Sequence, residues 1–247
     1  MGNYFTEGLI LRHLNFREAD RLVSIYSAER GLINVVAKAS RKISSKLAGS
    51  LEPFTLAKFM IVKGKKYDTV ASSEIIDVFR DLKSDLKKIR AAIFFADIVM
   101  STAKEMQRDA KLYDFLVSSF MELKKTQSDK KQVLNWRMWI YVWQYLAQSG
   151  YQPELYTCRV CQAKIKPEIL YFNYKKGGLV CRSCGSGENN VVISQNLVKI
   201  FRLILADETD KCQQIKITPD LRKEFILHTK NYFSYITERP LDMPFFK

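Results

Sequence analysis

The amino-acid sequence predicts an α+β protein of several domains, made of a small β-barrel, an all-α helical bundle and an inserted zinc ribbon with four cysteines. Three observations lead to this fold class. Residues 4–79 alternate short β-rich segments with turn residues, apolar side chains recur at helical spacing after residue 81, and two Cys-x-x-Cys pairs lie between residues 158 and 184. A chain of 247 residues is long enough for one large domain or two to three small ones.

Residues 1–80 are expected to form the barrel. Five segments rich in Val, Ile, Thr, Phe and Tyr are separated by breaks that contain turn residues: FTEGLILRHL, DRLVSIYSAE, LINVVAKAS, PFTLAKFMIV and YDTVASSEIIDVF. An isolated antiparallel sheet leaves its edges unpaired, so five short strands in this length favour a closed or nearly closed barrel. An SH3-like barrel is the competing small fold.

Residues 81–154 and 190–247 are expected to form the helical domain. One stripe of a long helix is predicted by spacings that alternate between four and three: Leu82, Leu86, Ile89, Ile93, Ala96, Met100 and Ala103. A second helix should run from Leu112 to Leu123. The next segment, QVLNWRMWIYVWQYLAQSG, is apolar on nearly every side, which is typical of a helix surrounded by others. Thr218 and Pro219 have the cap and first-turn chemistry of a final helix.

Residues 155–189 are expected to form the zinc ribbon. The ligands are Cys158, Cys161, Cys181 and Cys184, which have the spacing C-x2-C-x19-C-x2-C and can surround one tetrahedral ion. The start of the chain lacks a basic segment followed by an apolar run, and the longest apolar stretch is too short for a bilayer, so a cytoplasmic protein is expected. In a reducing compartment such pairs indicate a metal site before disulfides.

The predicted Zn²⁺ is structural. Four thiolates close the coordination shell, whereas catalytic zinc keeps an open position and usually has a His ligand. The two histidines, His13 and His228, are far from the cysteines in sequence. The fifth cysteine, Cys212, is excluded as a ligand by its spacing.

A strong positive charge indicates a polyanionic partner such as nucleic acid. Lys and Arg number 40 against 26 Asp and Glu, a formal net charge of +14. Two expected loops, AKASRKISSK and KGKK, hold the predicted DNA-binding residues Lys38, Arg41, Lys42, Lys46, Lys63, Lys65 and Lys66. Nearby Phe54, Phe59 and Tyr67 add the aromatic groups on which single strands stack, although Phe54 and Phe59 also fit a core. The lysines around the ribbon fit either DNA contact or a solvated face.

No catalytic motif is present, so a binding protein is favoured over an enzyme. The sequence has no P-loop, no Gly-rich dinucleotide turn and no Ser, His and acid set in a known context. His228 lies on an apolar helix face and is expected in the core. One alternative is a zinc-ribbon RNA-binding or ribosome-associated factor. A metal-dependent nuclease is another, but it would need clustered acids that the basic loops lack.

Four stretches in the same order resemble the bacterial recombination mediator family RecO: FREADRLVSIYSAERGLINVVAKASRK, LEPFTLAKF, SGYQPELYTCRVC and KGGLVCRSC. They span most of the chain and are specific when taken together. One departure is Ala39, where the family pattern usually has Gly before the basic residues. Because this position lies in a predicted loop, the departure concerns the shape of the loop and leaves its charge intact.

The resemblance implies a fold and a function. The fold is an N-terminal OB-fold, a helical middle domain and an embedded zinc ribbon. The function is binding of single- and double-stranded DNA, annealing of complementary strands and, with RecR, loading of RecA onto DNA coated by single-strand-binding protein (SSB). The protein would act near the nucleoid in the bacterial cytoplasm, with no membrane and no nucleotide hydrolysis.

The same resemblance implies docking on the acidic C-terminal tail of SSB. Such a tail needs a cation beside an apolar pocket. Arg137 is the candidate, because it is the one charge in the apolar stretch NWRMWIYVW. The alternative for Arg137 is a buried side chain paired with a carboxylate inside the bundle.

Overall fold

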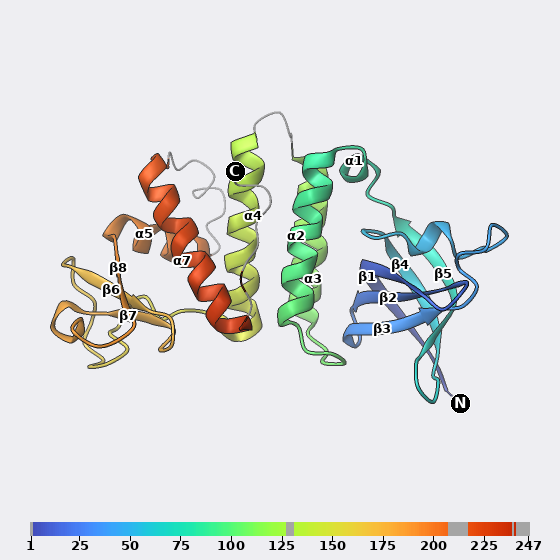
Figure 1. Cartoon of the computed structure of the whole chain (residues 1–247), viewed down its shortest axis with the longest axis horizontal. Coiled ribbons are helices and arrows are strands. Elements are labelled where there is room, and N and C mark those ends of the chain that lie inside the picture. The colour runs from blue at the N-terminus through green and yellow to red at the C-terminus, as the bar shows by residue number, and fades with distance from the viewer. Residues whose placement is uncertain (1, 127–130, 207–216, 239, 241–247) are drawn as a thin grey trace. The chain divides into compact units, whose positions relative to one another are not determined.

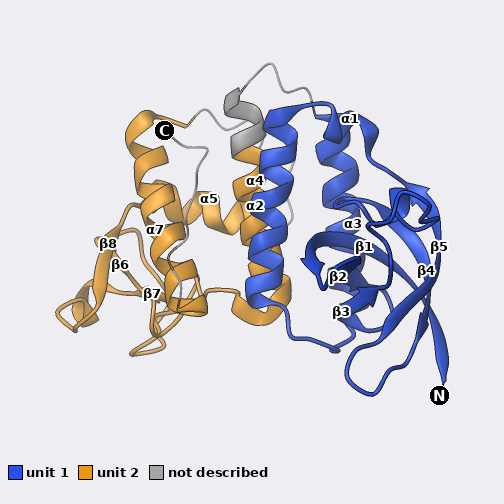
Figure 2. Cartoon of the chain, turned by 45° about the vertical axis from the view of Figure 1, so that its right-hand side comes forward, with its two compact units in different colours: residues 1–134 blue, residues 135–247 orange. Residues whose placement is uncertain are grey.

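A computed structural model describes residues 2–126, 131–206, 217–238 and 240 (Figure 1). The chain divides into two compact units, residues 1–134 and residues 135–247 (Figure 2). The helices that the sequence groups into one domain are therefore shared between the two units. The three-domain boundaries stay a prediction.

The first unit contains the strands β1 (Asn3–Phe16), β2 (Asp20–Ser27), β3 (Gly31–Ala37), β4 (Leu56–Val62) and β5 (Thr69–Asp77), a 3-10 turn η1 (Gly49–Leu51), and the helices α1 (Arg80–Lys83), α2 (Leu86–Thr102) and α3 (Ala110–Lys125). The second unit is reached along α4 (Lys131–Leu146) and contains a π-helical turn η2 (Ala147–Tyr151), the strands β6 (Leu170–Asn173), β7 (Gly178–Val180) and β8 (Asn190–Ile193), a 3-10 turn η3 (Arg182–Cys184), and the helices α5 (Gln195–Leu205) and α7 (Pro219–Thr237).

The five predicted strands are confirmed, and they close into a barrel with the order β1-β2-β3-β5-β4. The long strand β1 pairs with both β2 and β4 and has an irregularity between Ile10 and Arg12, which lets one strand serve both neighbours. A single parallel pair, Val36 with Thr69, joins β3 to β5. The ring of strands is thereby closed, as the physical argument predicts, but the contact between β3 and β5 is limited to this one pair.

The barrel is filled by side chains of the strands and of η1: Ile10, Val23, Ile25, Ile33, Val35, Ala37, Leu51, Ala57, Phe59, Ile61 and Val70. Phe59 is 1% exposed and Phe54 is 5% exposed. Both aromatic side chains are therefore core residues, and neither is available to stack on a base. Of the two roles that the sequence allowed for them, base stacking and core packing, the structure supports core packing.

The predicted long helix is wrong in two respects. It is interrupted after α1, and Asp85 starts α2 by accepting hydrogen bonds from the amides of Lys87 and Lys88. Its predicted buried stripe is partly exposed, because Leu86 is 73% and Ile93 46% exposed. The helix instead buries a face that includes Phe94 and Phe95. The other apolar residues of α2 that are buried are Ala91, Ala92, Ala96, Ile98 and Val99. Two adjacent aromatic rings remove more apolar surface from water than Leu86 and Ile93, so they decide the rotation.

The predicted second helix is confirmed as α3, and it packs on α2 inside the first unit. The ring of Phe95 lies 6.2 Å from that of Phe120 and 6.4 Å from that of Phe115. Asp109 accepts a hydrogen bond from the amide of Leu112 and so caps the first turn of α3. The aromatic contacts hold the two helices of this unit together.

The predicted central helix is confirmed in the second unit as α4. The ring of Trp143 stacks on Tyr232 at 5.5 Å and lies 4.3 Å from Phe201, while its indole Nε1 donates to Thr229 Oγ1 at 2.9 Å. Helices α5 and α7 thus cover α4. The last helix begins as predicted, with Pro219 in its first turn and Thr218 Oγ1 accepting from the amide of Leu221 at 3.3 Å.

Strands β7, β6 and β8 form a small antiparallel sheet, with β6 in the middle. His228 of α7 is 1% exposed, which confirms it as a core residue of this unit. Its Nε2 donates to the carbonyl of Val192 at 3.1 Å, which leaves Nδ1 to accept from Tyr174 Oη at 2.9 Å. Within the described ranges, none of the helices has the length and apolar character needed to cross a bilayer.

Candidate nucleic-acid interface and metal centre

Two of the barrel's loops meet where β3 ends. The loop of residues 38–48 leaves β3 there and is tied to the turn between β1 and β2. The amide of Arg41 donates to the carbonyl of Ala19 at 3.0 Å, and Arg41 Nη1 donates to the carbonyl of Glu18 at 2.8 Å. The amide of Ala39 donates to Asp20 Oδ1 at 2.8 Å. The amides of Ala39 and Arg41, together with the side chains of Arg41 and Asp20, therefore fix the start of this basic loop.

A third loop, residues 63–68, is attached to the same end of β3. The amide of Val36 donates to the carbonyl of Asp68 at 2.8 Å. The carboxylate of Asp68 accepts from the amide of Gly64 at 3.1 Å and from Tyr4 Oη at 2.9 Å. Gly64 is required in this turn, because a Cβ there would lie 2.0 Å from the carbonyl oxygen of Tyr67. One aspartate thus shapes the loop that displays the KGKK lysines.

All seven predicted DNA-binding side chains are exposed. Lys38, Arg41 and Lys42 lie at the start of the loop 38–48, beside the β1–β2 turn. The loop 63–68, with Lys63, Lys65 and Lys66, is held at the same strand end. Lys46 lies further along the loop 38–48, next to Leu47, which packs against the barrel core. The structure therefore brings all seven cations to two loops that share one anchoring point, with Lys46 furthest from it along the chain.

Ala39, the departure from the family pattern, has a left-handed backbone with φ of 52°. Glycine adopts this region without steric cost, whereas an alanine Cβ crowds the neighbouring carbonyl. The hydrogen bond from the amide of Ala39 to Asp20 holds the residue in this conformation. The loop thus has a backbone conformation that favours glycine even though glycine is absent.

Two aromatic side chains stand between these loops. The rings of Phe16 and Tyr67 lie edge to face, with centroids 5.6 Å apart and an interplanar angle of 74°. The guanidinium carbon of Arg17 lies 5.1 Å from the centroid of Phe16, and Lys66 Nζ lies 5.7 Å from that of Tyr67. We call these four residues the aromatic–cation cluster. Phe16 and Arg17 are not among the predicted contact residues; the available signal was an aromatic residue directly before a charged turn.

A second functional feature is the group of four cysteines. The Sγ atoms of Cys158, Cys161, Cys181 and Cys184 all lie within 4.8 Å of one another, and the four residues could hold a metal ion. Cys158 and Cys161 lie in the loop before β6, while Cys181 directly precedes η3 and Cys184 is its last residue. The Sγ of Cys158 accepts from the amides of Val160 at 3.4 Å and Cys181 at 3.5 Å. Such amide groups favour a thiolate.

The local fold explains how the two pairs meet. The amide of Leu179 donates to the carbonyl of Glu154 at 2.8 Å, which joins the approach to the first pair with the strand before the second. Gly178 permits this contact, because a Cβ there would lie 2.4 Å from that carbonyl oxygen. Four sulfur donors without His or carboxylate form a soft, complete tetrahedral set, which fits Zn²⁺. His228 is engaged with Tyr174 and Val192. Cys212 lies outside the described residues.

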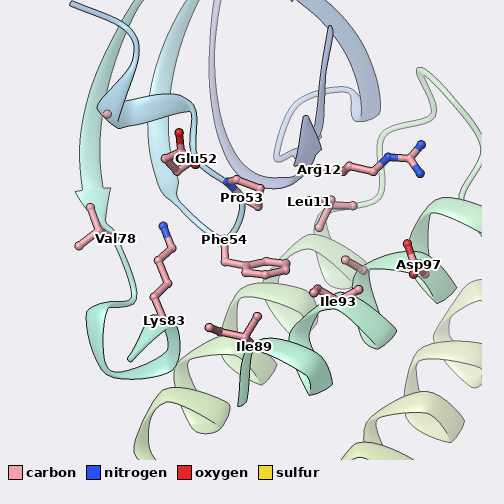
Figure 3. A pocket seen from close by; sticks show the side chains of 12 residues that line it. Leu11, Arg12, Glu52, Pro53, Phe54, Val78, Lys83, Ile89, Ile93 and Asp97 are labelled. Atoms are coloured by element: carbon pink, nitrogen blue, oxygen red, sulfur yellow. The ribbon is translucent and has the colours of Figure 1, made fainter. Parts of the chain in front are cut away.

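A third feature is an apolar hollow of about 590 Å³ in the first unit, between the barrel and helices α1 and α2 (Figure 3). Phe54 faces Ile89 and Ile93 across it, so the exposed stripe of α2 forms one wall. Lys83 lies at one end and Arg12 at the other. The remaining lining residues are Leu11, Gly49, Glu52, Pro53, Val78, Ala96 and Asp97. We call this hollow the α2 groove.

Two charged groups of the α2 groove have pKa values that their surroundings shift. Burial lowers the pKa of Lys83, while Glu52 and Asp77 oppose that shift, and Lys83 Nζ donates to Thr55 Oγ1 at 2.9 Å. Burial raises the pKa of Asp97, and the neighbouring Arg12 counteracts the rise. Arg137, the predicted tail anchor, lies half-buried on α4 in the second unit and is not among the lining residues. Its role as an anchor stays a prediction.

These features define a class of protein. It is an α+β chain that contains a closed barrel with basic loops and a four-cysteine module that could hold a metal. Residues 1–79 match the family model described as "Recombination protein O N terminal", and residues 83–242 match "Recombination protein O C terminal". The chain belongs to this family, the RecO family. Its members carry out DNA repair and recombination, and the predicted family resemblance is confirmed.

Three similar proteins illustrate how far the likeness extends, and each is named DNA repair protein RecO. The one from Desulforamulus reducens is 26% identical over 96% of this chain and 91% of its own length. The one from Dehalococcoides mccartyi strain 195 is 28% identical over 96% of this chain and 92% of its own. The one from Roseiflexus sp. strain RS-1 is 29% identical over 96% of this chain and 82% of its own.

Proposed function

We propose that this chain is a non-enzymatic mediator of DNA repair and recombination. Its barrel, which we assign as an OB-fold from its strand order, binds single- and double-stranded DNA and anneals complementary strands. The observation that carries the proposal is the anchoring of two exposed basic loops, residues 38–48 and 63–68, at the end of β3. The family membership supports the DNA-repair context.

Annealing follows from the physics of such a surface. Two DNA strands repel each other through their phosphates, and a protein that neutralises phosphates releases counterions and lowers this repulsion. The loops are held by backbone hydrogen bonds and by Asp68, so the lysine side chains stay free to follow a phosphate chain. A surface of this kind concentrates two strands without reading their sequence.

The test removes four charges together, in the variant Lys38→Ala, Arg41→Ala, Lys42→Ala and Lys46→Ala. Single-strand affinity at moderate salt should fall, and the slope of log affinity against log salt should become shallower by about 3, at about 0.7 per phosphate contact. The matched control removes three lysines and one arginine elsewhere: Arg90→Ala, Lys104→Ala, Lys111→Ala and Lys230→Ala. An unchanged affinity and slope in the loop variant would contradict the assignment.

With RecR, the chain is proposed to help load RecA onto SSB-coated single strands, in the bacterial cytoplasm at the nucleoid. The acidic SSB tail would dock where a cation borders an apolar pocket. The α2 groove meets this requirement with Arg12 and Lys83 beside Phe54 and Ile93, and Arg137 is the second candidate.

Binding of an SSB-tail peptide, followed by fluorescence anisotropy, separates the two docking candidates. Ile93→Glu should weaken binding if the groove is used, because a carboxylate is placed on an apolar wall and repels the tail. Arg137→Ala should weaken peptide binding if the tail docks on Arg137 of α4 instead. Annealing of SSB-coated strands, with SSB carrying or lacking its tail, then tests whether docking matters. An annealing rate that is the same with and without the SSB tail would count against docking.

The four cysteines are proposed to hold one structural Zn²⁺, which cross-links the two Cys-x-x-Cys turns. Elemental analysis of the purified protein should find one zinc per chain. No reaction is proposed; a DNA cleavage assay with Mg²⁺ tests the alternative of a nuclease. Matched RNA and DNA strands test the alternative of an RNA-binding or ribosome-associated factor, which would prefer RNA.

A further inference from the structure

We propose that the aromatic–cation cluster is a base-stacking site that receives an unpaired nucleobase on the ring of Tyr67. The inference rests on the proposed function, because it assumes that the basic loops bind nucleic acid. It adds what those loops alone lack, namely a contact that distinguishes an unpaired strand from a duplex. The residues involved are Phe16, Arg17, Lys66 and Tyr67.

Tyr67 differs from Tyr4 and Tyr113 of the same unit, whose hydroxyls are held by hydrogen bonds to carboxylates. The hydroxyl of Tyr4 donates to Asp68 at 2.9 Å, and the hydroxyl of Tyr113 donates to Glu7 at 2.8 Å. The hydroxyl of Tyr67 forms no hydrogen bond to any residue that the structure describes, and Tyr67 is 38% exposed. A buried Tyr is normally placed by its hydroxyl, whereas Tyr67 is placed by its ring.

The ring of Tyr67 is supported from one side. Phe16 meets it edge to face at 5.6 Å, and Phe16 itself is half-buried at the end of β1. The two residues are 51 positions apart in sequence, so their contact fixes the loop 63–68 against the β1–β2 turn. An aromatic ring that is held in place loses little freedom when a base stacks on it, and this preorganisation favours binding.

One cation lies over each ring, so a base that stacks on the face of Tyr67 covered by Lys66 displaces its exposed ammonium group. Arg17 lies 5.1 Å from the Phe16 centroid and Lys66 lies 5.7 Å from the Tyr67 centroid. A stacked nucleotide carries a phosphate on each side of its sugar, and cations beside the rings can neutralise these phosphates. The cluster therefore joins the two elements that single-strand binders combine, a stacking ring and a basic track.

A duplex cannot use the same contact without distortion. The faces of its bases are covered by their neighbours, so a base must be unstacked and unpaired before it reaches the ring. Phosphate contacts by Lys38 or Lys65 are open to both forms of DNA. The cluster thus selects unpaired strands, while the lysines supply affinity that is common to both.

The test compares Tyr67→Leu with Tyr67→Phe, for an oligonucleotide and for a duplex of the same sequence at two salt concentrations. Loss of one stacking contact corresponds to a factor of about 5 to 150 in affinity. Tyr67→Leu should weaken single-strand binding within that range, change duplex binding less than twofold and leave the salt slope unchanged, because no charge is removed. Tyr67→Phe should restore single-strand binding.

A second measurement uses the unaltered protein and so does not depend on the folding of a variant. Ultraviolet cross-linking to oligo-dT, followed by mass spectrometry, should place an adduct on the peptide that contains Tyr67. Equal losses for both DNA forms in Tyr67→Leu, or cross-links only to other peptides, would overturn the stacking site. The proposed function fails separately, when the four-charge loop variant binds both forms as well as the unaltered chain.

Discussion

The barrel and the four-cysteine sheet hold themselves together by different means. The barrel encloses eleven buried side chains, all of them apolar, and every strand contributes at least one. The sheet β7-β6-β8 has beside it a small cluster of three buried residues, two of which are Cys158 and Cys181. In this cluster, groups that would be ligands of a metal thus stand where the barrel has apolar side chains, although Phe172 of β6 is buried against α7. A barrel of this kind is stabilised by removing hydrocarbon from water, whereas a sheet this small needs a cross-link.

The largest effect is expected from removing a metal ligand. Cys158→Ser, or chelation of the metal, should abolish the fold of the four-cysteine module, because in small metal modules the binding free energy is folding free energy. Hydrogen exchange should show β6, β7 and the cysteine turns unprotected, with the barrel strands unchanged. Cys212→Ser is the matched control and should leave protection intact. If the amides of β6 stay protected from exchange in the chelated protein, the sheet does not depend on a metal cross-link, and the proposed difference from the barrel is wrong.

The next largest effect is a cavity in the barrel. Phe59→Ala should lower the free energy of unfolding by about 3–5 kcal/mol, the usual result for a buried Phe. Urea denaturation measures it. Phe5→Ala is the matched control in the same barrel, because Phe5 is 73% exposed, and it should change stability by less than about 0.5 kcal/mol. Equal effects of the two substitutions would mean that the barrel does not depend on its apolar filling.

A smaller, pH-dependent effect is expected at His228 in the second unit. Burial lowers the pKa of His228 below its ordinary value of 6.5, although the hydrogen bond with Val192 and the charge of Glu224 oppose the shift. The unfolded chain therefore binds a proton at a pH where the folded chain does not. Stability should fall as the pH decreases below about 6.5, and it should level off once the folded state also takes up the proton.

His228→Gln isolates this contribution. The difference in melting temperature between neutral and mildly acidic pH should be smaller in the variant than in the unaltered chain. Both proteins keep the cysteines, so protonation of the thiolates affects them alike and cancels in the comparison. An identical pH dependence in the two proteins would show that His228 titrates normally in the fold.

The smallest effect is expected at Ala39 in the barrel. Ala39→Gly removes the strain of a left-handed alanine, worth about 1–2 kcal/mol, but it also frees the unfolded chain at a cost of about 0.4–1 kcal/mol. The net gain should thus be about 1 kcal/mol or less. Ala39→Val should have the opposite sign, because a β-branched residue fits this region poorly. Thermal unfolding of both variants checks the order, and a stabilising valine would contradict it.

Local patterns predicted much of this molecule. The five strands, the four cysteines and the cap at Thr218 all follow from residues close together in sequence. Periodicity failed at Leu86 and Ile93, because α2 has two apolar stripes and only the packing of Phe94 and Phe95 decides which one turns inward. The pairing of Phe16 with Tyr67 was equally hidden, since it depends on how a closed barrel brings distant turns together.

The loop 38–48 has a consequence for how such a protein changes over evolutionary time. Its conformation is set by the amides of Ala39 and Arg41 and by their acceptors in the β1–β2 turn. Lys42 adds only its backbone to this network, since its amide donates to the carbonyl of Ala39 at 3.1 Å. Among the described residues, the side chains of Lys38, Lys42 and Lys46 form no hydrogen bond or ion pair that would hold the loop. Substitutions at these three positions should therefore be nearly neutral for folding. If the loop binds DNA as proposed, its affinity can therefore change by substitution of these lysines while the scaffold stays the same.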